Sequence, residues 1–298
     1  MWWIYFLSCS TGSKQTDSTE EIVMDSGQSE ARFSVFLMAD PHLTGAGEAQ
    51  ERLQRTVAWV NTNAELYDLS FVMILGDVAW GEGLQLSKQI LDELVIPYVP
   101  IIGDNEIHAG DEQRFGEVFS SVFERNADFF DDWQDSFQEV WNPEYDRYGV
   151  FYNSTFSYKG VRFMGLDWAS RSSHAIQGEM GDLHAFEGGT LSWLDSTLAT
   201  LELEQKPIFM ASHIPMYVNV GAFDTAEMET LEVIFASYAD RFQANFAGHY
   251  HTDVENEQNH YDLYVLDAIW DDEIRFRILD IRLDAGEVTF ETTLMEIE

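Results

Sequence analysis

Five side chains that can bind metal ions stand where apolar runs of the sequence end. They are three carboxylates and two imidazoles: Asp40, Asp77, Asp104, His213 and His249. Two more imidazoles follow two residues after members of this set, His42 in "DPH" and His251 in "GHYH". Carboxylates combined with imidazoles suit Mn, Fe and Zn, and two such ions about 3.5–4 Å apart can activate water and clamp a phosphoryl group. The pattern predicts a two-metal site suited to phosphoryl transfer.

The apolar runs have the length and composition of buried strands. The first three cover 33–40, 71–77 and 98–104, and helical spacing of apolar residues separates them at 48–65 and 84–94. A β-α-β-α-β series implies parallel strands with helices packed outside. Ligands bind beyond the carboxyl ends of the strands in such sheets, which is where the metal-capable residues stand.

Later segments extend the same plan. Further strands are expected at 161–167, 206–213, 242–249 and 261–268, a helix at 190–202, and a C-terminal hairpin turning at 284–286. The aromatic and acidic stretch at about 108–147 is helix-prone, and we expect it to form a helical cap insertion. No linker interrupts 32–298, which we interpret as one domain.

The segments "ADPHL", "LGDVAW", "IGDNE", "SHIP" and "AGHYH" resemble, in order and approximate spacing, the motifs of the calcineurin-like metallophosphoesterases. The family pattern is D-x-H, G-D, G-N-H-[DE], H and G-H-x-H. The resemblance implies an α/β (α+β) fold, a two-layered β sandwich with mixed sheets flanked by helices. It implies hydrolysis of a phosphomonoester or phosphodiester by a metal-bridging hydroxide, with two divalent ions (Mn, Fe, Zn or similar).

Roles carry over from this resemblance by position. Asp40, His42 and His251 match ligands of the first metal, and Asp77 matches the bridging carboxylate. His213 and His249 match ligands of the second metal, together with Asp104, which stands where the family has Asn.

The third motif departs from the family at two positions, because Gly103-Asp104-Asn105-Glu106 replaces G-N-H-E. Asp104 keeps an oxygen ligand but adds a negative charge. Asn105 removes an imidazole, and an amide cannot serve as a general acid. In an alternative register Asn105 is the ligand and Asp104 is peripheral. Asn105, Glu106 and His108 are the candidate catalytic residues, with Asn105 orienting the phosphate and His108 available as a substitute acid.

Two other functions remain open. One is a nucleotide or cyclic-nucleotide phosphodiesterase, although nothing in the sequence is recognisable as a base-binding element. The other is a catalytically weak cell-surface binding protein on the same fold, which the substitutions at Asp104 and Asn105 would suit. Three histidines outside the motifs, His174, His184 and His260, are expected on the surface or in the cap, with His174 or His184 as possible substrate contacts.

Charge limits the partners. The 298 residues contain 53 Asp and Glu against 16 Lys and Arg, a net charge of -37, which repels the phosphates of nucleic acids. The resemblance implies a phosphate-ester small molecule or a phosphodiester as the substrate, which this charge allows only where something strongly positive, such as a metal, lies in the site. Residues 1–31 resemble a shortened lipoprotein signal followed by a polar tether. Lipidation of Cys9 would attach an exported protein to a membrane, in the periplasm or at the cell surface, whereas a misassigned N-terminus would leave it cytoplasmic.

Overall fold

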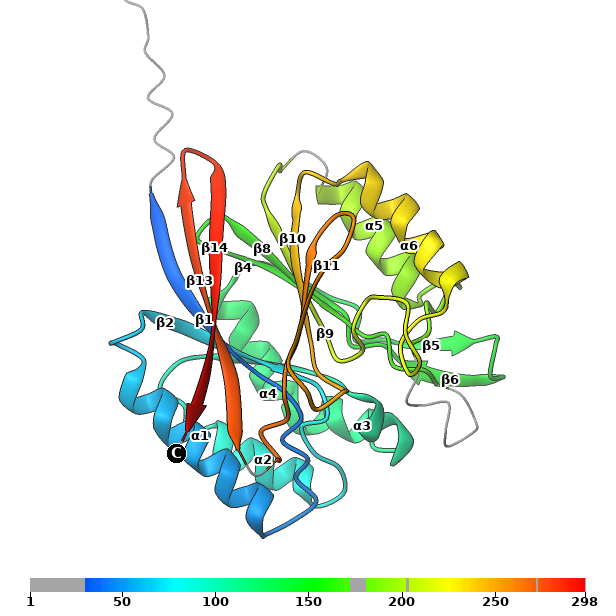
Figure 1. Cartoon of the computed structure of the whole chain (residues 1–298). Coiled ribbons are helices and arrows are strands. Elements are labelled where there is room, and N and C mark those ends of the chain that lie inside the picture. Colours follow the sequence, from blue (N-terminus) through cyan, green and yellow to red (C-terminus); the bar gives the residue numbers. More distant parts are fainter. Residues whose placement is uncertain (1–29, 172–180, 202–203, 272, 298) are drawn as a thin grey trace, which may run out of the picture.

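The computed structural model describes residues 30–171, 181–201, 204–271 and 273–297 (Figure 1). Residues 1–29, which make up nearly all of the expected signal and tether and include Cys9, lie outside the described residues. Within the described ranges, no helix is both long enough and apolar enough to cross a membrane.

The first sheet has five strands and carries the N-terminal β-α-β-α-β unit. Its order is β14 (Glu287–Ile297), β13 (Ile274–Asp284), β1 (Ala31–Met38), β2 (Leu69–Leu75) and β3 (Tyr98–Ile101). β1, β2 and β3 run parallel, while β13 and β14 form the predicted hairpin and add antiparallel strands, so the sheet is mixed. The crossovers are α1 (Glu48–Asn63) and α2 (Gly83–Leu91).

The second sheet has seven strands. Its order is β11 (Val254–Glu257), β12 (Asp262–Val265), β10 (Phe242–Ala247), β9 (Ile208–Ser212), β8 (Val161–Leu166), β7 (Ser154–Tyr158) and β4 (Asp131–Asp135). Its four central strands, β12, β10, β9 and β8, run parallel, and the outer strands are antiparallel to their neighbours. Two helices connect its central strands: α5 (Thr190–Leu201) lies between β8 and β9, and α6 (Thr225–Ser237) lies between β9 and β10.

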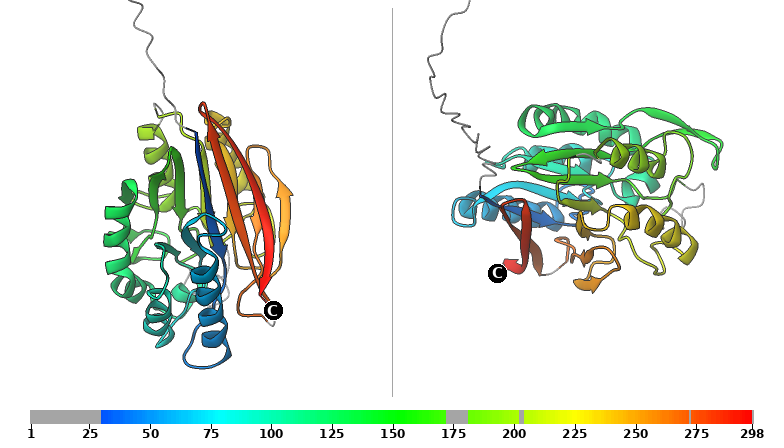
Figure 2. Two further views of the ribbon diagram at one scale, coloured as in Figure 1. Left: turned by 90° about the vertical axis from the view of Figure 1, so that its left-hand side faces the viewer. Right: turned by 90° about the horizontal axis from the view of Figure 1, so that it is seen from above.

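The two sheets face each other, and helices cover their outer faces (Figure 2). Side chains alternate along each strand between two cores. The core between the sheets includes Phe33 and Phe71 from one sheet and Phe163 and Phe209 from the other. The other residues of the same strands, such as Phe36 and Met210, pack in the core beneath the helices. This confirms the two-layered sandwich and explains why the central strands are apolar on both faces.

The expected helical cap at 108–147 is wrong in part. Only α4 (Glu112–Phe129) is a long helix, and it packs against β3 and α2 on the outside of the first sheet. The rest of the segment forms β4, at the edge of the second sheet, and β5 (Glu139–Asn142), which pairs with β6 (Arg147–Val150) in a separate hairpin. These strands are short and largely exposed, so the sequence contains no apolar run that would predict them.

Candidate metal centre

All seven predicted metal ligands lie at the carboxyl ends of strands. Asp40 and Asp77 follow β1 and β2, and Asp104 begins the short helix α3 (Asp104–His108) just after β3. His213 directly follows β9, and His249 lies two residues after β10. Parallel strands of both sheets therefore direct these loops to one edge of the sandwich.

Five of the seven adopt left-handed backbone conformations. The φ angles are 54° at Asp40, 50° at His42, 48° at Asp77, 79° at His249 and 49° at His251. Such conformations are uncommon for residues other than glycine and concentrate at functional sites, where surrounding structure holds them. Loop-to-loop hydrogen bonds supply that support, including the His42 amide to the Asp77 carbonyl at 2.9 Å.

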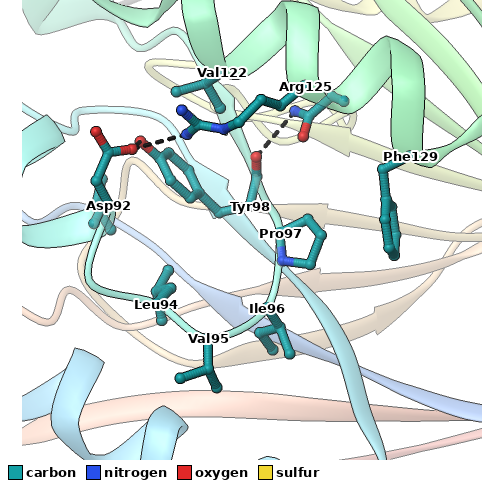
Figure 3. A pocket seen from close by; sticks show the side chains of 11 residues that line it. Asp92, Leu94, Val95, Ile96, Pro97, Tyr98, Val122, Arg125 and Phe129 are labelled. Atoms are coloured by element: carbon teal, nitrogen blue, oxygen red, sulfur yellow. Dashed lines mark hydrogen bonds and ion pairs between the residues drawn. The ribbon is translucent and has the colours of Figure 1, made fainter.

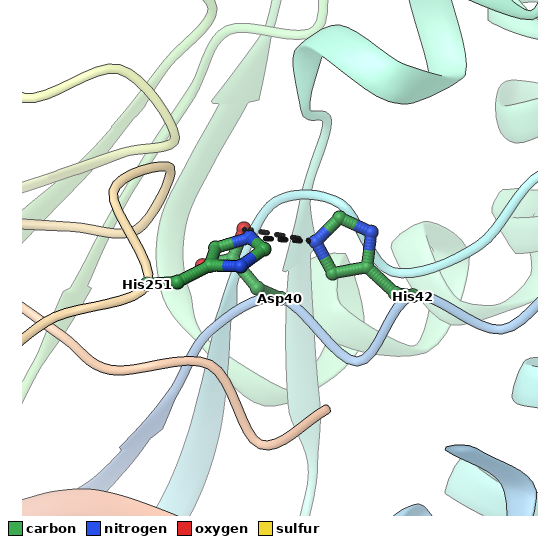
Figure 4. Close-up of side chains that lie close together, drawn as sticks. All are labelled: Asp40, His42 and His251. Carbon is green, nitrogen blue, oxygen red and sulfur yellow. Dashed lines mark hydrogen bonds and ion pairs between the residues drawn. The ribbon is translucent and has the colours of Figure 1, made fainter. Parts of the chain in front are cut away.

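The first group of ligand atoms consists of Asp40, His42 and His251 (Figure 4). The Nε2 atoms of His42 and His251 lie 2.9 Å apart. They lie 3.6 Å and 3.5 Å, respectively, from Oδ1 of Asp40. Three donor atoms from the loops after β1 and β10 thus converge on one point.

The second group consists of Asp104, His213 and His249. Oδ1 of Asp104 lies 2.6 Å from Nε2 of His213 and 3.3 Å from Nδ1 of His249. The remaining ring nitrogens are held by backbone carbonyls, Nδ1 of His213 by Leu75 and Nε2 of His249 by Gly221, both at 2.9 Å. If those nitrogens carry the ring protons, each imidazole presents a lone pair toward Asp104.

Asp77 lies between the two groups. One of its carboxylate oxygens is 3.6 Å from Nε2 of His42, and the other is 3.4 Å from Nε2 of His213. Asp40, Asp77 and His213 also form a group of converging ligand atoms of their own. Asp77 is thus placed where the resemblance puts the bridging carboxylate.

Of the two alternatives for the third motif, the structure has the one in which Asp104, and not Asn105, faces the second group. Asn105 instead contacts Asp77: its backbone amide donates to Oδ1 at 2.9 Å, and its side-chain amide donates to Oδ2. Glu106 lies beneath the site, with its two oxygens accepting hydrogen bonds from the backbone amides of Ala79 and Gly103, each at 2.9 Å. Because both oxygens are engaged in tying the loops after β2 and β3, Glu106 acts as a positioning residue in this structure.

Each glycine of the "GD", "GD" and "GH" pairs packs against a ligand from another loop. A Cβ at Gly76 would overlap the His213 ring, and one at Gly103 would overlap Asp77. A Cβ at Gly248 would meet Oδ2 of Asp40 at 2.5 Å. The glycines thus permit the loops to approach closely enough for their ligand atoms to converge.

The electrostatics of the cluster favour bound cations. Burial opposes ionisation of Asp40 and Asp104, but hydrogen bonds from the neighbouring histidines outweigh it and lower the pKa of both carboxyls. Burial likewise disfavours the imidazolium of His213, yet the charge of Asp77, a hydrogen bond that the imidazole donates to Asp104 and further carboxylate charge raise its pKa well above the ordinary value. Without metal ions, the raised pKa values of His213 and His251 let protons on these two imidazoles balance part of the buried carboxylate charge.

The other predicted residues lie elsewhere. His108 is exposed at the end of α3, His260 pairs with Glu232 at 3.2 Å, and His174 lies outside the described residues. His184 was expected on the surface or in the cap, or as a substrate contact, and the surface position is wrong: it is fully buried, and burial lowers the pKa of its imidazole to about 4. Its apolar neighbours Leu183 and Phe186 did not predict this burial, because neither belongs to a recognisable strand or helix.

Sequence reasoning missed the aromatic rim of the centre. The ring of Trp80 stands edge-on to His42, with centroids 5.4 Å apart, and the ring of Trp270 lies 5.7 Å from His42 and 6.1 Å from His251. Trp270 is 45% exposed, and no motif surrounds it. Only its position shortly after β12, another strand that ends at this edge, could have suggested a role.

A separate surface pocket lies between the α2–β3 loop and α4 (Figure 3). Its polar groups satisfy one another, since Asp92 accepts hydrogen bonds from Arg125 at 2.8 Å and from Tyr98 at 3.0 Å. The pocket shares no residue with the metal-ligand groups. It is not a candidate for the chemistry.

The donor set fits two divalent ions. Each group combines imidazole nitrogen with carboxylate oxygen, the chemistry that Mn, Fe and Zn accept. Four of the separations between imidazole and carboxylate atoms, at 3.3–3.6 Å, are close to about 3–3.5 Å, the spacing of adjacent ligands on one ion with bonds near 2.0–2.2 Å, whereas the 2.6 Å between Asp104 and His213 is shorter.

Comparisons with known proteins identify the family and agree with the fold. The family model for calcineurin-like phosphoesterases matches residues 33–253. A dimetal phosphatase from Danio rerio has a similar fold, with a TM-score of 0.58 and 14% identity, over 87% of this chain and 98% of that one. A putative 5'-nucleotidase from Staphylococcus aureus, solved in complex with alpha-ketoglutarate, also has a similar fold. Its TM-score is 0.55 and its sequence identity 11%, over 89% of this chain and 54% of that one. No curated protein sequence matches. The chain belongs to the calcineurin-like phosphoesterase family.

Proposed function

We propose that this protein is a two-metal phosphoesterase that hydrolyses a phosphomonoester or a phosphodiester at the edge of its sandwich. The observation that carries the proposal is the pairing of two Asp/His groups across one carboxylate: Asp77 faces His42 on one side and His213 on the other. Family membership supports hydrolysis of a phosphoric ester.

Six residues would hold the two ions, three on each side of Asp77. Asp40, His42 and His251 form one side, and Asp104, His213 and His249 form the other. Two bound divalent ions would supply Lewis-acid activation of water and neutralise charge on the phosphoryl oxygens. The backbone carbonyls of Leu75 and Gly221 would fix the orientations of His213 and His249, as outer hydrogen bonds commonly do for ligating imidazoles.

Asn105 has two tasks in this proposal. One N–H of its side-chain amide holds Asp77, and the second N–H remains available to a phosphoryl oxygen, because an amide nitrogen carries two hydrogens. Asn105 cannot protonate a departing alkoxide. We therefore expect a preference for substrates whose leaving group needs no proton, unless another acid such as the exposed His108 moves within reach.

A leaving-group series tests this part of the proposal. Rates on aryl phosphates should fall steeply as the pKa of the phenol rises, and an Asn105→His variant should show a shallower slope. A wild-type slope no steeper than that of the variant would show that no acid is missing. A His108→Ala variant with an unchanged slope would remove His108 as the substitute.

Nucleotides form a second candidate substrate class, favoured by the aromatic rim. The rings of Trp80 and Trp270 stand beside His42, at the first group of ligands, and stacking on an aromatic ring contributes about 1–3 kcal/mol per base. Comparing Trp270→Ala with wild type on nucleoside phosphates and on aryl phosphates tests this. A rise in KM confined to nucleoside substrates supports base stacking, and an equal change on both classes contradicts it.

The main experiment measures hydrolysis of p-nitrophenyl phosphate and bis(p-nitrophenyl) phosphate by metal-stripped protein resupplied with Mn²⁺. Activity should depend on the ion and fall at least about 100-fold in Asp77→Asn, which removes the shared carboxylate. Asp128→Asn, at an exposed carboxylate on α4, is the matched control and should behave as wild type. Full activity of Asp77→Asn would refute the two-metal proposal, and a folded, metal-loaded protein inactive on both esters would favour the binding-protein alternative.

A further inference from the structure

A third cluster of possible metal ligands lies apart from the dinuclear centre. It consists of Glu144, in the turn between β5 and β6, with Asp182 and His184 in the segment that follows residues 172–180. One ligand atom from each residue lies within 4.8 Å of the others. The cluster shares no residue with the two groups around Asp77.

His184 provides the observation that points to a cation. Its side chain is fully buried, and its Nε2 lies 3.1 Å from the carbonyl of Ala169. If Nε2 carries the ring proton and donates it to that carbonyl, Nδ1 presents a lone pair. Among the described residues, no hydrogen-bond partner faces Nδ1, although a buried nitrogen ordinarily has one.

A carboxylate oxygen lies near Nδ1 of His184. Oδ1 of Asp182 lies 3.5 Å from Nδ1 and is fixed by the backbone amide of His184 at 2.8 Å. The second Asp182 oxygen accepts from the hydroxyl of Tyr145 at 3.0 Å. Two electron-pair donors held this close repel unless a cation lies between them, and 3.5 Å is close to the roughly 3.3–3.4 Å edge of a zinc coordination tetrahedron.

The surroundings strengthen this reading. His184 adopts a left-handed conformation, with φ of 49°, like five of the seven ligands at the main centre. The nearby guanidinium of Arg171 is neutralised by Asp167, to which it donates two hydrogen bonds of 2.6 Å, so it does not compensate Asp182. Burial and the proximity of Asp182 together raise the pKa of Glu144, as expected for carboxylates that crowd one place without a counterion.

We infer that Glu144, Asp182 and His184 form a third metal site, which binds a single divalent transition ion such as Zn²⁺ or Mn²⁺. One imidazole nitrogen and two carboxylate oxygens are a donor set that these ions accept. The site would clamp the β5–β6 turn to the body of the protein, where Tyr145 already contacts Asp182.

The clamp would also reach the dinuclear centre indirectly. Gly181, next to Asp182, donates its backbone amide to the carbonyl of Ala222 at 3.0 Å. The neighbouring carbonyl of Gly221 is the one that holds His249. An ion bound at Asp182 would therefore stabilise the loop that orients a ligand of the main centre, which makes this a structural site.

Metal stoichiometry of the full chain tests the inference. Metal-stripped protein is dialysed against a small excess of Zn²⁺ over three ions per chain, in high salt with excess Mg²⁺, which displaces ions held loosely by the acidic surface, and zinc is measured by mass spectrometry. Wild type and the matched control Glu187→Gln, at an exposed carboxylate three residues from His184, should each bind three ions per chain. Asp182→Asn should bind two, and Glu144→Gln should release the third ion at lower chelator concentration.

Other arms separate this site from the main one. An Asp40→Asn/His213→Asn variant should lose the dinuclear ions yet keep one Zn²⁺ that Asp182→Asn removes. If circular dichroism shows that Asp182→Asn is misfolded, the Glu144→Gln variant, at an exposed position, provides the test by itself. Two ions in wild type, or three in Asp182→Asn, would overturn the inference. A protein that binds the third ion but hydrolyses no ester would refute the proposed function and leave this site intact.

Discussion

Asn105 holds both oxygens of the Asp77 carboxylate, one through its backbone amide at 2.9 Å and the other through its side-chain amide. The residue that replaces the family's imidazole therefore orients the carboxylate shared by the two ligand groups. With Asn in place of His, position 105 can no longer supply an acid, but its side chain supports Asp77.

Removing this support should weaken metal binding. Asn105→Ala keeps the backbone hydrogen bond and deletes the side-chain one, so Asp77 gains freedom between the two groups. Loss of such an outer contact typically costs about 10–100-fold in metal affinity or activity. The Mn²⁺ concentration for half-maximal activity should rise by that factor. An unchanged activation curve would show that Asn105 does not position Asp77.

The extra charge of Asp104 should favour metal over substrate. Three carboxylates, Asp40, Asp77 and Asp104, face two divalent ions, whereas Asp104→Asn leaves two and makes the loaded site more positive by one charge. The variant should bind its second ion about 10-fold or more weakly, yet at saturating metal inorganic phosphate should inhibit it more strongly than wild type. Calorimetric metal titration and phosphate inhibition constants check both halves. Weaker metal binding with weaker phosphate inhibition would contradict the charge argument.

The glycine before Asp104 should be intolerant of a methyl group. A Cβ at Gly103 would overlap both the side chain and the backbone nitrogen of Asp77, neither of which can move without disturbing the centre. Overpacking of this kind costs about 1–3 kcal/mol. Gly103→Ala should lower the unfolding free energy by that amount and reduce metal affinity, as measured by urea unfolding with and without Mn²⁺.

Gly45→Ala is the matched control, because no atom lies within 4 Å of a Cβ at that position. Gly45 lies in the loop after His42, so this variant shows the effect of a methyl group that is near the centre but overlaps no neighbouring atom. Equal stability of the two variants would mean that the loops after β2 and β3 can separate at little cost.

The strand ends and the ligand positions could be predicted because buried parallel strands leave a strong pattern. Apolar runs such as 71–77 are continuous, and a polar residue at their end stands out. The ambiguity between Asp104 and Asn105 could not be resolved from sequence, because both side chains offer an oxygen ligand and the sequence does not give the direction in which either one points. That direction depends on Asp77, which comes from a different loop.

Other features were hidden for a similar reason. Glu106 has the residue type of a catalytic acid, but its role comes from two backbone amides that the fold brings to it. The burial of His184 depends on the packing of Phe151, whose ring centroid lies 4.6 Å away, and of other residues distant in sequence. β4, β5 and β6 are polar and short, so their pairing is set by neighbours and not by their own composition.

Buried His184 should make the metal-free protein less stable in mild acid. Burial lowers its pKa to about 4, against 6.5 in the unfolded chain, so the unfolded state takes up a proton first as pH falls. Stability is unaffected above pH 6.5 and declines between 6.5 and 4, by about 2 kcal/mol at pH 5. Urea unfolding in EDTA at pH 7 and pH 5 should show a decline that is smaller by this amount in His184→Gln. The same decline in both proteins would show that His184 titrates normally.

Anomalous diffraction from crystals grown with Mn²⁺ tests the two-metal centre most directly. Two peaks should lie at the strand ends, one among Asp40, His42 and His251 and the other among Asp104, His213 and His249, with Asp77 contacting both. A single peak, or a second ion bound by Asn105 in place of Asp104, would contradict the account.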